Sequence, residues 1–251
     1  MKDKYVLANQ TIAALVKIPT VQVDRKNFLK DQFKGDPNLK RILAEGPQAV
    51  YSADELRDMA NDIIKDNVGK AATTSILAGL PSNPLIMLGT GAADVAQFFG
   101  LSLRMAQQLA YLFGSDELFS AKSKLTDAEE ERLLALLGAM FGVSGAAAVL
   151  FVGSKRIAEP IGTKLAGKAA MKAVGHPVIK KIGHAVGSRI FHQSLGQTLT
   201  KSVPVIGAVS SGALTYVTFK PMGARLADLL AENLKEQEKL AADQDQLINE
   251  K

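Results

Sequence analysis

Three long stretches of this chain carry no charged side chain, and they limit what the chain can fold into. They cover residues 71–93, 133–154 and 202–219 of the 251. A helix needs about 20 apolar residues to cross the hydrocarbon core of a bilayer, and each stretch is close to that length. The chain must therefore bury these residues, either against its own helices or in a membrane.

The residues within these stretches favour a protein interior over a bilayer. Pro81 and Pro84 interrupt the first stretch, and Pro204 lies in the third. The second contains Gly138 and Gly142, a pair whose spacing lets helices approach closely, as in membrane bundles. Leu and Ile each contribute only a few tenths of a kcal/mol of favourable free energy to membrane insertion. Stretches rich in Gly, Ser and Ala therefore gain little free energy from inserting. We favour a buried core or reversible insertion, and stable spanning stays open.

The spacing of apolar residues predicts the fold class. Apolar residues recur at intervals of three and four, and β-branched residues nowhere form a sustained alternation. We predict an all-α fold, a single compact helical domain with a central apolar helical hairpin whose membrane insertion is left open. The predicted regions are an N-terminal helical region (1–70), a helical core (71–230) and a solvated C-terminal tail (231–251). The last helix is expected from about Pro221 onward.

Positive charge is concentrated in residues 155–201, which hold nine Lys and Arg against one acidic residue, Glu159. The net charge of the whole chain is only +5, so the excess belongs to this block. It predicts two basic amphipathic helices that contact anionic membrane lipid. The predicted contact residues are Lys164, Lys168, Lys172, Lys180, Lys181 and Arg189. Alternatively, these cations are the solvated face of ordinary helices packed on the core.

An acidic protein is a second partner that the basic block would fit. Nucleic acid is a weaker candidate. No aromatic stacking platform lies among the charges, and no helix-turn-helix or RNA-recognition signature is present.

A set of polar residues lies in apolar surroundings between residues 94 and 108. Asp94, Gln97, Arg104 and Gln108 are spaced so that they share one face of a helix. They could form a polar seam that lines a cavity or an ion path. The interpretation that we favour is a satisfied buried polar network that fixes how the helices pack.

No catalytic, cofactor-binding or metal-binding residues can be proposed from the sequence. Cysteine is absent, and the three histidines, His176, His184 and His192, lack the i, i+4 spacing of a helical zinc site. No nucleophile elbow, phosphate-binding loop or HExxH motif occurs. We therefore expect a protein that is not an enzyme.

Several segments, in this order, resemble the EcsC family over about residues 10–230. They are Val16-Lys17-Ile18-Pro19, Ala78-Gly79-Leu80-Pro81, Ala93-Asp94-Val95-Ala96-Gln97-Phe98-Phe99, Leu103-Arg104-Met105-Ala106-Gln107-Gln108, Gly142-Val143-Ser144-Gly145, Val203-Pro204-Val205-Ile206-Gly207 and Thr218-Phe219-Lys220-Pro221. The family takes its name from a gene that neighbours a bacterial ABC transporter, and the resemblance implies no catalytic residues.

The resemblance and the charge pattern together predict a bacterial, membrane-associated protein. We expect no signal peptide, because the N-terminal residues are charged and no apolar segment with a cleavage site follows. The expected location is the cytoplasm, peripheral or integral at the inner face of the cell membrane. The alternatives are a soluble module that regulates an envelope or ABC-transport system, and a protein with a lipid-binding cavity.

Overall fold

The computed structural model of the chain describes residues 3–71, 92–120, 124–152, 176–194 and 211–249. Every regular element in these parts is helical, which confirms the predicted all-α class. The elements are α1 (Lys4–Leu15), α2 (Arg25–Gln32), α3 (Leu39–Glu45), the 3₁₀ turn η1 (Pro47–Ala49), α4 (Ala53–Ala71), α6 (Ala92–Leu112), α7 (Asp127–Met140), α8 (Ala146–Val152), α11 (His176–Ser194) and α12 (Ser211–Asn249).

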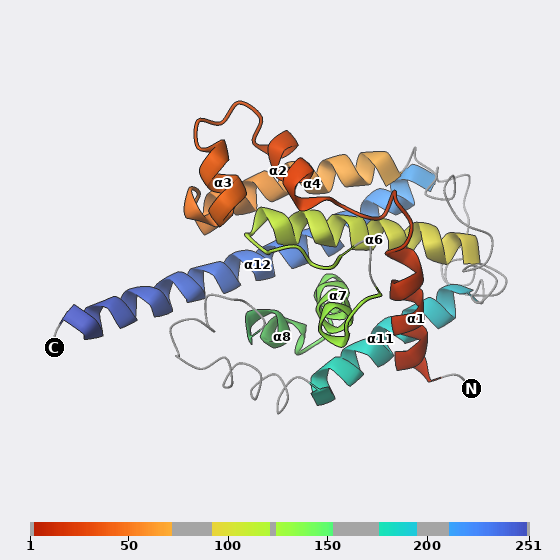
Figure 1. The fold of residues 1–251 in the computed structure, drawn as a ribbon. Coiled ribbons are helices and arrows are strands. Elements are labelled where there is room, and N and C mark those ends of the chain that lie inside the picture. The colour runs from red at the N-terminus through yellow and green to blue at the C-terminus, as the bar shows by residue number, and fades with distance from the viewer. Residues whose placement is uncertain (1–2, 72–91, 121–123, 153–175, 195–210, 250–251) are drawn as a thin grey trace.

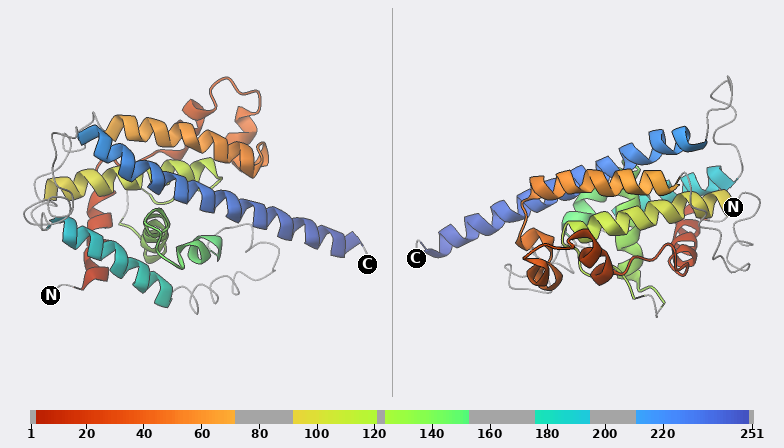
Figure 2. Two further views of the ribbon diagram at one scale, coloured as in Figure 1. Left: turned by 180° about the vertical axis from the view of Figure 1, so that it is seen from behind. Right: turned by 90° about the horizontal axis from the view of Figure 1, so that it is seen from above.

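Helix α7 lies at the centre of the molecule, where Figure 1 shows it end-on. Helices α4, α6 and α12 run side by side on one side of α7, and α8 and α11 lie on the other, as the rear view in Figure 2 also shows. Helix α1 crosses α11 and also contacts α7. A single hydrophobic core joins residues from all of these helices, so the chain forms one domain.

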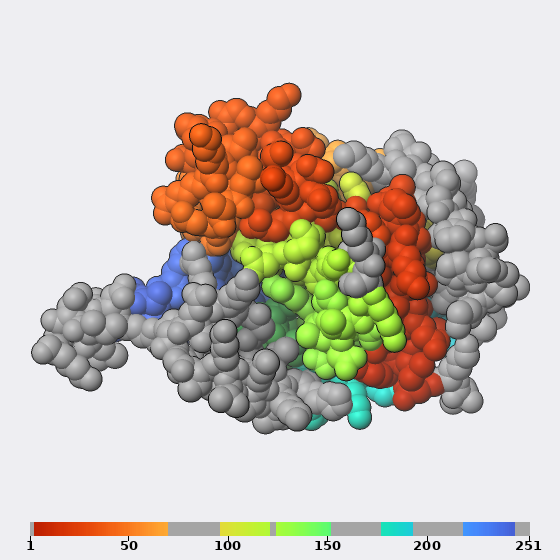
Figure 3. All heavy atoms as spheres, in the orientation of Figure 1, coloured from red at the N-terminus to blue at the C-terminus, as the bar shows by residue number. Residues whose placement is uncertain are grey.

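The N-terminal region is built into this core. Helix α1 packs on α11, and α4 packs along α12, so segments far apart in the sequence lie side by side. Figure 3 shows the red and orange N-terminal residues seated against the green residues of α6 and α7. Residues 3–71 therefore depend on the C-terminal helices for much of their packing.

The second charge-free stretch does not form one helix, which corrects its interpretation as a candidate span. Residues 133–140 form the end of α7 and are buried, because other helices surround α7. The chain then turns with Gly142 at φ +70°, a left-handed conformation that glycine adopts without strain. Helix α8 begins at Ala146. The stretch is thus divided between a central helix and a short one.

Among the helices of the described parts, none combines the length and the hydropathy of a membrane span. Residues 72–91 of the first stretch, 153–154 of the second and 202–210 of the third lie outside those parts.

Helix α12 begins earlier than predicted, at Ser211, and Pro221 lies inside it. A proline inside a helix removes a backbone hydrogen bond and costs about 3 kcal/mol, so local rules end a helix near such a residue. Here Phe219, Met222 and Leu226 are buried on the two sides of the proline. Their burial in the core offsets the local cost.

The residues predicted to be a solvated tail continue α12 as far as Asn249. Ala231 and Leu234 are still buried, whereas most side chains of residues 235–243 are exposed. Figure 1 shows this end of α12 extending beyond the other helices. The tail is therefore a helix, and its first turn belongs to the core.

Capping boxes are present at the starts of α4 and α7. The Thr126 hydroxyl accepts from the Glu129 backbone N–H at 3.3 Å, and the Glu129 carboxylate accepts from the Thr126 backbone N–H at 2.7 Å. At the start of α4, the Glu55 carboxylate accepts from the backbone N–H of Ser52 at 2.8 Å and from its hydroxyl at 2.7 Å. These bonds satisfy donors that a helix start otherwise leaves without partners.

Glu55→Gln should lower the melting temperature at neutral pH, and the difference from the parent should disappear in acid. The hydrogen bonds from the Ser52 backbone N–H and then the Ser52 hydroxyl lower the pKa of Glu55 below its ordinary 4.5. A lowered folded-state pKa contributes stability above the unfolded value, and this contribution is lost as pH falls through the folded value. Thermal melts between pH 7 and pH 3 measure the difference in melting temperature between parent and variant. A difference that stays constant below pH 4.5 would contradict the role of the Glu55 carboxylate as a cap.

Candidate functional site

Helix α11 carries two distinct faces. Ile179, Ile182, Val186 and Ile190 form an apolar stripe, and all four are fully buried in the core. Lys180 and Lys181 point the other way and are exposed. The Lys181 ammonium lies 3.1 Å from the Ser144 hydroxyl, in the turn between α7 and α8. The core therefore uses the apolar side of α11 and leaves a cationic side on the surface.

Other residues complete the exposed face of α11. Positions 184 and 191 fall on the same side as the two lysines by helical spacing, and both His184 and Phe191 are exposed. The Nε2 atom of His184 lies 3.6 Å from the Asp3 carboxylate, so one acidic group borders the face. The face thus combines cations with an exposed aromatic ring.

Arg189, which the prediction grouped with the lysines, is also exposed, and it makes contacts with the end of α7 that the two lysines do not make. Its guanidinium donates to the Phe141 carbonyl at 3.2 Å and lies 4.6 Å from the centre of the Phe141 ring. Burial, and then the charge of Arg225, lower the pKa of Arg189. Arg225 donates to the Met140 carbonyl at 2.7 Å. Two arginines therefore hold the last carbonyls of α7, at the negative end of its dipole.

The remaining predicted contact residues, Lys164, Lys168 and Lys172, lie outside the described residues. So does the side chain of Asp94, although its backbone belongs to α6. Gln97 lies one turn further along α6 and is half-buried.

Arg104 and Gln108 of the predicted polar set bind different partners. The Arg104 guanidinium donates to the carbonyls of Thr20 and Gln22, at 3.0 and 3.1 Å. Burial lowers the pKa of Arg104, and the charge of Asp66 opposes this shift. The Gln108 side-chain oxygen accepts from the Asn67 amide of α4 at 2.7 Å. These contacts tie α6 to the loop after α1 and to α4.

Gln107 is the polar residue that the sequence analysis missed. It is fully buried and makes three hydrogen bonds. Its amide nitrogen donates to the carbonyls of Val21 and Leu103, both at 2.9 Å, and its oxygen accepts from the Val23 backbone N–H at 3.1 Å. Its position three residues after Arg104, on the same side of α6, was the available signal.

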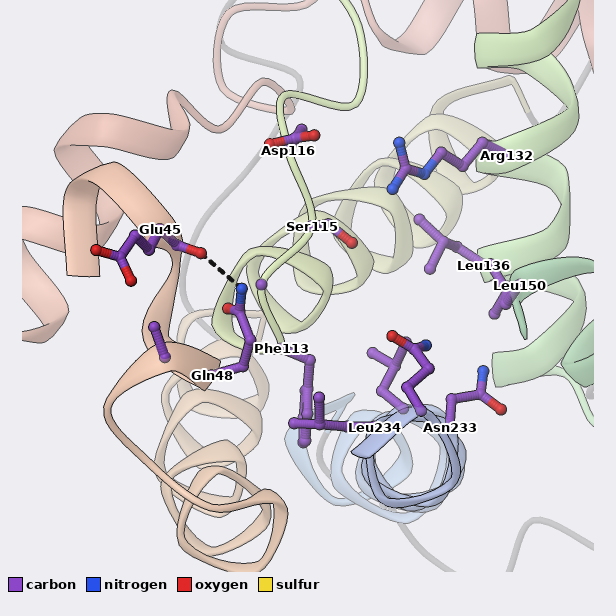
Figure 4. A pocket seen from close by; sticks show the side chains of 14 residues that line it. Glu45, Gln48, Phe113, Ser115, Asp116, Arg132, Leu136, Leu150, Asn233 and Leu234 are labelled. Carbon is purple, nitrogen blue, oxygen red and sulfur yellow. Dashed lines mark hydrogen bonds between the residues drawn. The ribbon is translucent and has the colours of Figure 1, made fainter. Parts of the chain in front are cut away.

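A cavity of about 300 Å³ opens where five parts of the chain meet (Figure 4). These parts are the segment from the end of α3 through η1, the loop after α6, and helices α7, α8 and α12. Its walls include Arg132 and Asp116, and Figure 4 shows the Arg132 guanidinium extending from α7 toward the loop that carries Asp116. Sequence analysis did not predict this site, because no local pattern joins these segments.

A glycine and a glutamine shape one wall of the cavity. The Gln48 side-chain nitrogen donates to the Glu45 carbonyl at 2.6 Å, as Figure 4 shows. Gly114, with φ +87°, lies so close to the Gln48 carboxamide that a Cβ there would overlap it. The wall therefore favours glycine for its backbone conformation, and a Cβ there would also displace the Gln48 carboxamide.

Comparison with known proteins adds no further constraint: no family model, no curated protein and no solved structure matches the chain.

Proposed function

We propose that this chain is a non-enzymatic helical protein that binds an anionic membrane surface through the outer face of α11. The supporting observation is that α11 has a buried apolar face and an exposed cationic face. Its apolar stripe packs into the core, so Lys180 and Lys181 are presented outward on a helix that is anchored to the core. Each Lys near an anionic surface adds about 1 kcal/mol of attraction.

The proposed contact is peripheral. Insertion of the central apolar helix would require the buried residues of α7 to leave their packing against α6, α11 and α12. Surface contact through α11 needs no such rearrangement. Phe191, with 36% of its surface exposed, lies on the same face and would enter the headgroup region.

The cytoplasmic face of a bacterial membrane is the proposed location. The resemblance to the EcsC family and the basic block at residues 155–201 both favour this surface, which is rich in anionic lipid. Lys164, Lys168 and Lys172 belong to the same block and are proposed as additional contacts. Family membership itself stays a prediction.

The test is sedimentation of the protein with vesicles of phosphatidylcholine, with and without phosphatidylglycerol. We expect binding only to the anionic vesicles, weakened by added salt. The double variant Lys180→Gln/Lys181→Gln should bind about thirtyfold more weakly, since two lost contacts amount to about 2 kcal/mol.

A matched control is Lys26→Gln/Lys30→Gln, which removes two exposed cations from α2 and leaves the net charge equal to that of the test variant. It should bind as the parent does. Equal loss in both variants would indicate a response to net charge alone and would refute the assignment to α11. Absence of binding to either vesicle would remove the membrane proposal and favour an acidic protein as the partner.

A further inference from the structure

The cavity of Figure 4 has a mixed lining that suits a small amphipathic ligand. Its apolar wall consists of the residue that follows α6 and of side chains from α7, α8 and α12. These are Phe113, Leu136, Leu150, Leu230 and Leu234. Amide side chains of α12, Asn233 and Gln237, lie beside this wall. A few polar groups that converge on an apolar surface are typical of small-molecule sites.

Arg132 is the cation of this cavity. The residue is half-buried, and this burial lowers the pKa of Arg132, while the charge of Asp116 opposes the shift. Within the described residues, its guanidinium makes no hydrogen bond. No nitrogen of this guanidinium is sealed from solvent without a partner, so its five N–H donors can reach a ligand that enters the cavity. A carboxylate would supply two of these acceptors in the planar geometry that a guanidinium matches.

Asp116 supplies charge of the opposite sign. It comes from the loop after α6, whereas Arg132 comes from α7, so the two charges lie on different walls. Figure 4 shows both side chains at the same end of the cavity, with the leucines of α7, α8 and α12 farther along. Glu45 also lines the cavity, but its carboxylate pairs with Arg41 at 3.1 Å, and Figure 4 shows it directed away from Arg132. Arg132 and Asp116 together favour a dipolar ligand over a phosphate dianion, which Asp116 would repel.

We propose that this cavity binds a small zwitterion of the amino-acid type. Its carboxylate pairs with the Arg132 guanidinium, and its ammonium group faces Asp116. Its side chain lies on the leucine wall, and Asn233 or Gln237 hydrogen-bonds its polar atoms. This site is separate from the outer face of α11, so the proposal does not depend on membrane binding.

Isothermal titration calorimetry of the full chain tests it, with L-leucine, L-methionine and L-glutamine as probes at up to about 10 mM. We expect at least one of them to bind. Its amide derivative, which lacks the carboxylate, and its N-acetyl derivative, which lacks the ammonium group, should each bind at least about tenfold more weakly, because each loses one charged contact.

Two variants locate the binding. Arg132→Gln should weaken it about tenfold or more, and Asn233→Phe should abolish it by filling the cavity from a partly exposed position on α12. Lys30→Gln, on exposed α2, is the control and should bind as the parent does. Circular dichroism and thermal melts establish which variants are folded. The proposal is overturned if none of the three amino acids binds the parent, or if the folded Asn233→Phe protein or the amide derivative binds unchanged.

Discussion

Gly187→Ala is expected to destabilise the protein by about 2–3 kcal/mol, although it adds only one methyl group. The residue lies on α11 where α1 crosses it. A Cβ at this position would overlap the Lys4 carbonyl and come within 2.6 Å of the Lys4 carbonyl carbon. Backbone atoms cannot rotate away as a side chain can, so α1 would have to shift. Urea unfolding measures the change in the free energy of unfolding.

Two further Gly→Ala variants make this prediction specific. At Gly183 the added Cβ would meet the Tyr5 ring, within 2.9 Å of its Cε2 atom, and a ring can move. Gly183→Ala should therefore cost less than Gly187→Ala. At Gly69 of α4 no atom of the described residues lies within 4 Å of the added Cβ, so Gly69→Ala should stabilise the protein by up to about 1 kcal/mol through helix propensity. Equal effects at positions 69 and 187 would show that α1 does not dock as described.

Gln107→Leu is expected to cost about 2–4 kcal/mol, because it removes a buried group that serves three backbone partners. The substitution leaves the Val23 N–H and the Val21 carbonyl without their partner in the interior. The loop from Thr20 to Val23 would then be held mainly by Arg104. Urea unfolding gives the energy, and amide exchange at Val23 reports the loosened loop.

The neighbouring glutamine provides the matched control. Gln108→Leu removes the same chemical group from the next residue of α6, but Gln108 is only half-buried and accepts one bond, from Asn67. Asn67 still donates to the Ile63 carbonyl. We expect the free energy of unfolding to fall by about 1 kcal/mol or less, and amide hydrogen exchange at Val23 to stay unchanged. A larger loss from Gln108→Leu than from Gln107→Leu would contradict the assignment.

Two helix starts and one buried helix face were determined by local sequence. The capping boxes at Ser52 and Thr126 predict the starts of α4 and α7, because they satisfy donors within the same turn of chain. The apolar stripe of α11 from Ile179 to Ile190 was likewise readable, since helical spacing alone decides which residues share a face. These features depend on residues no more than a few turns apart.

Tertiary structure alone decided what each polar group contacts. Arg189 is an exposed cation, and only the position of α7 brings its guanidinium onto Phe141. Local rules end a helix near Pro221, but burial of the residues on both sides lets α12 continue past the proline. Arg132 and Asp116 meet at one cavity because α7 and the loop after α6 come together there. Such contacts join residues distant in the chain, and no local spacing specifies them.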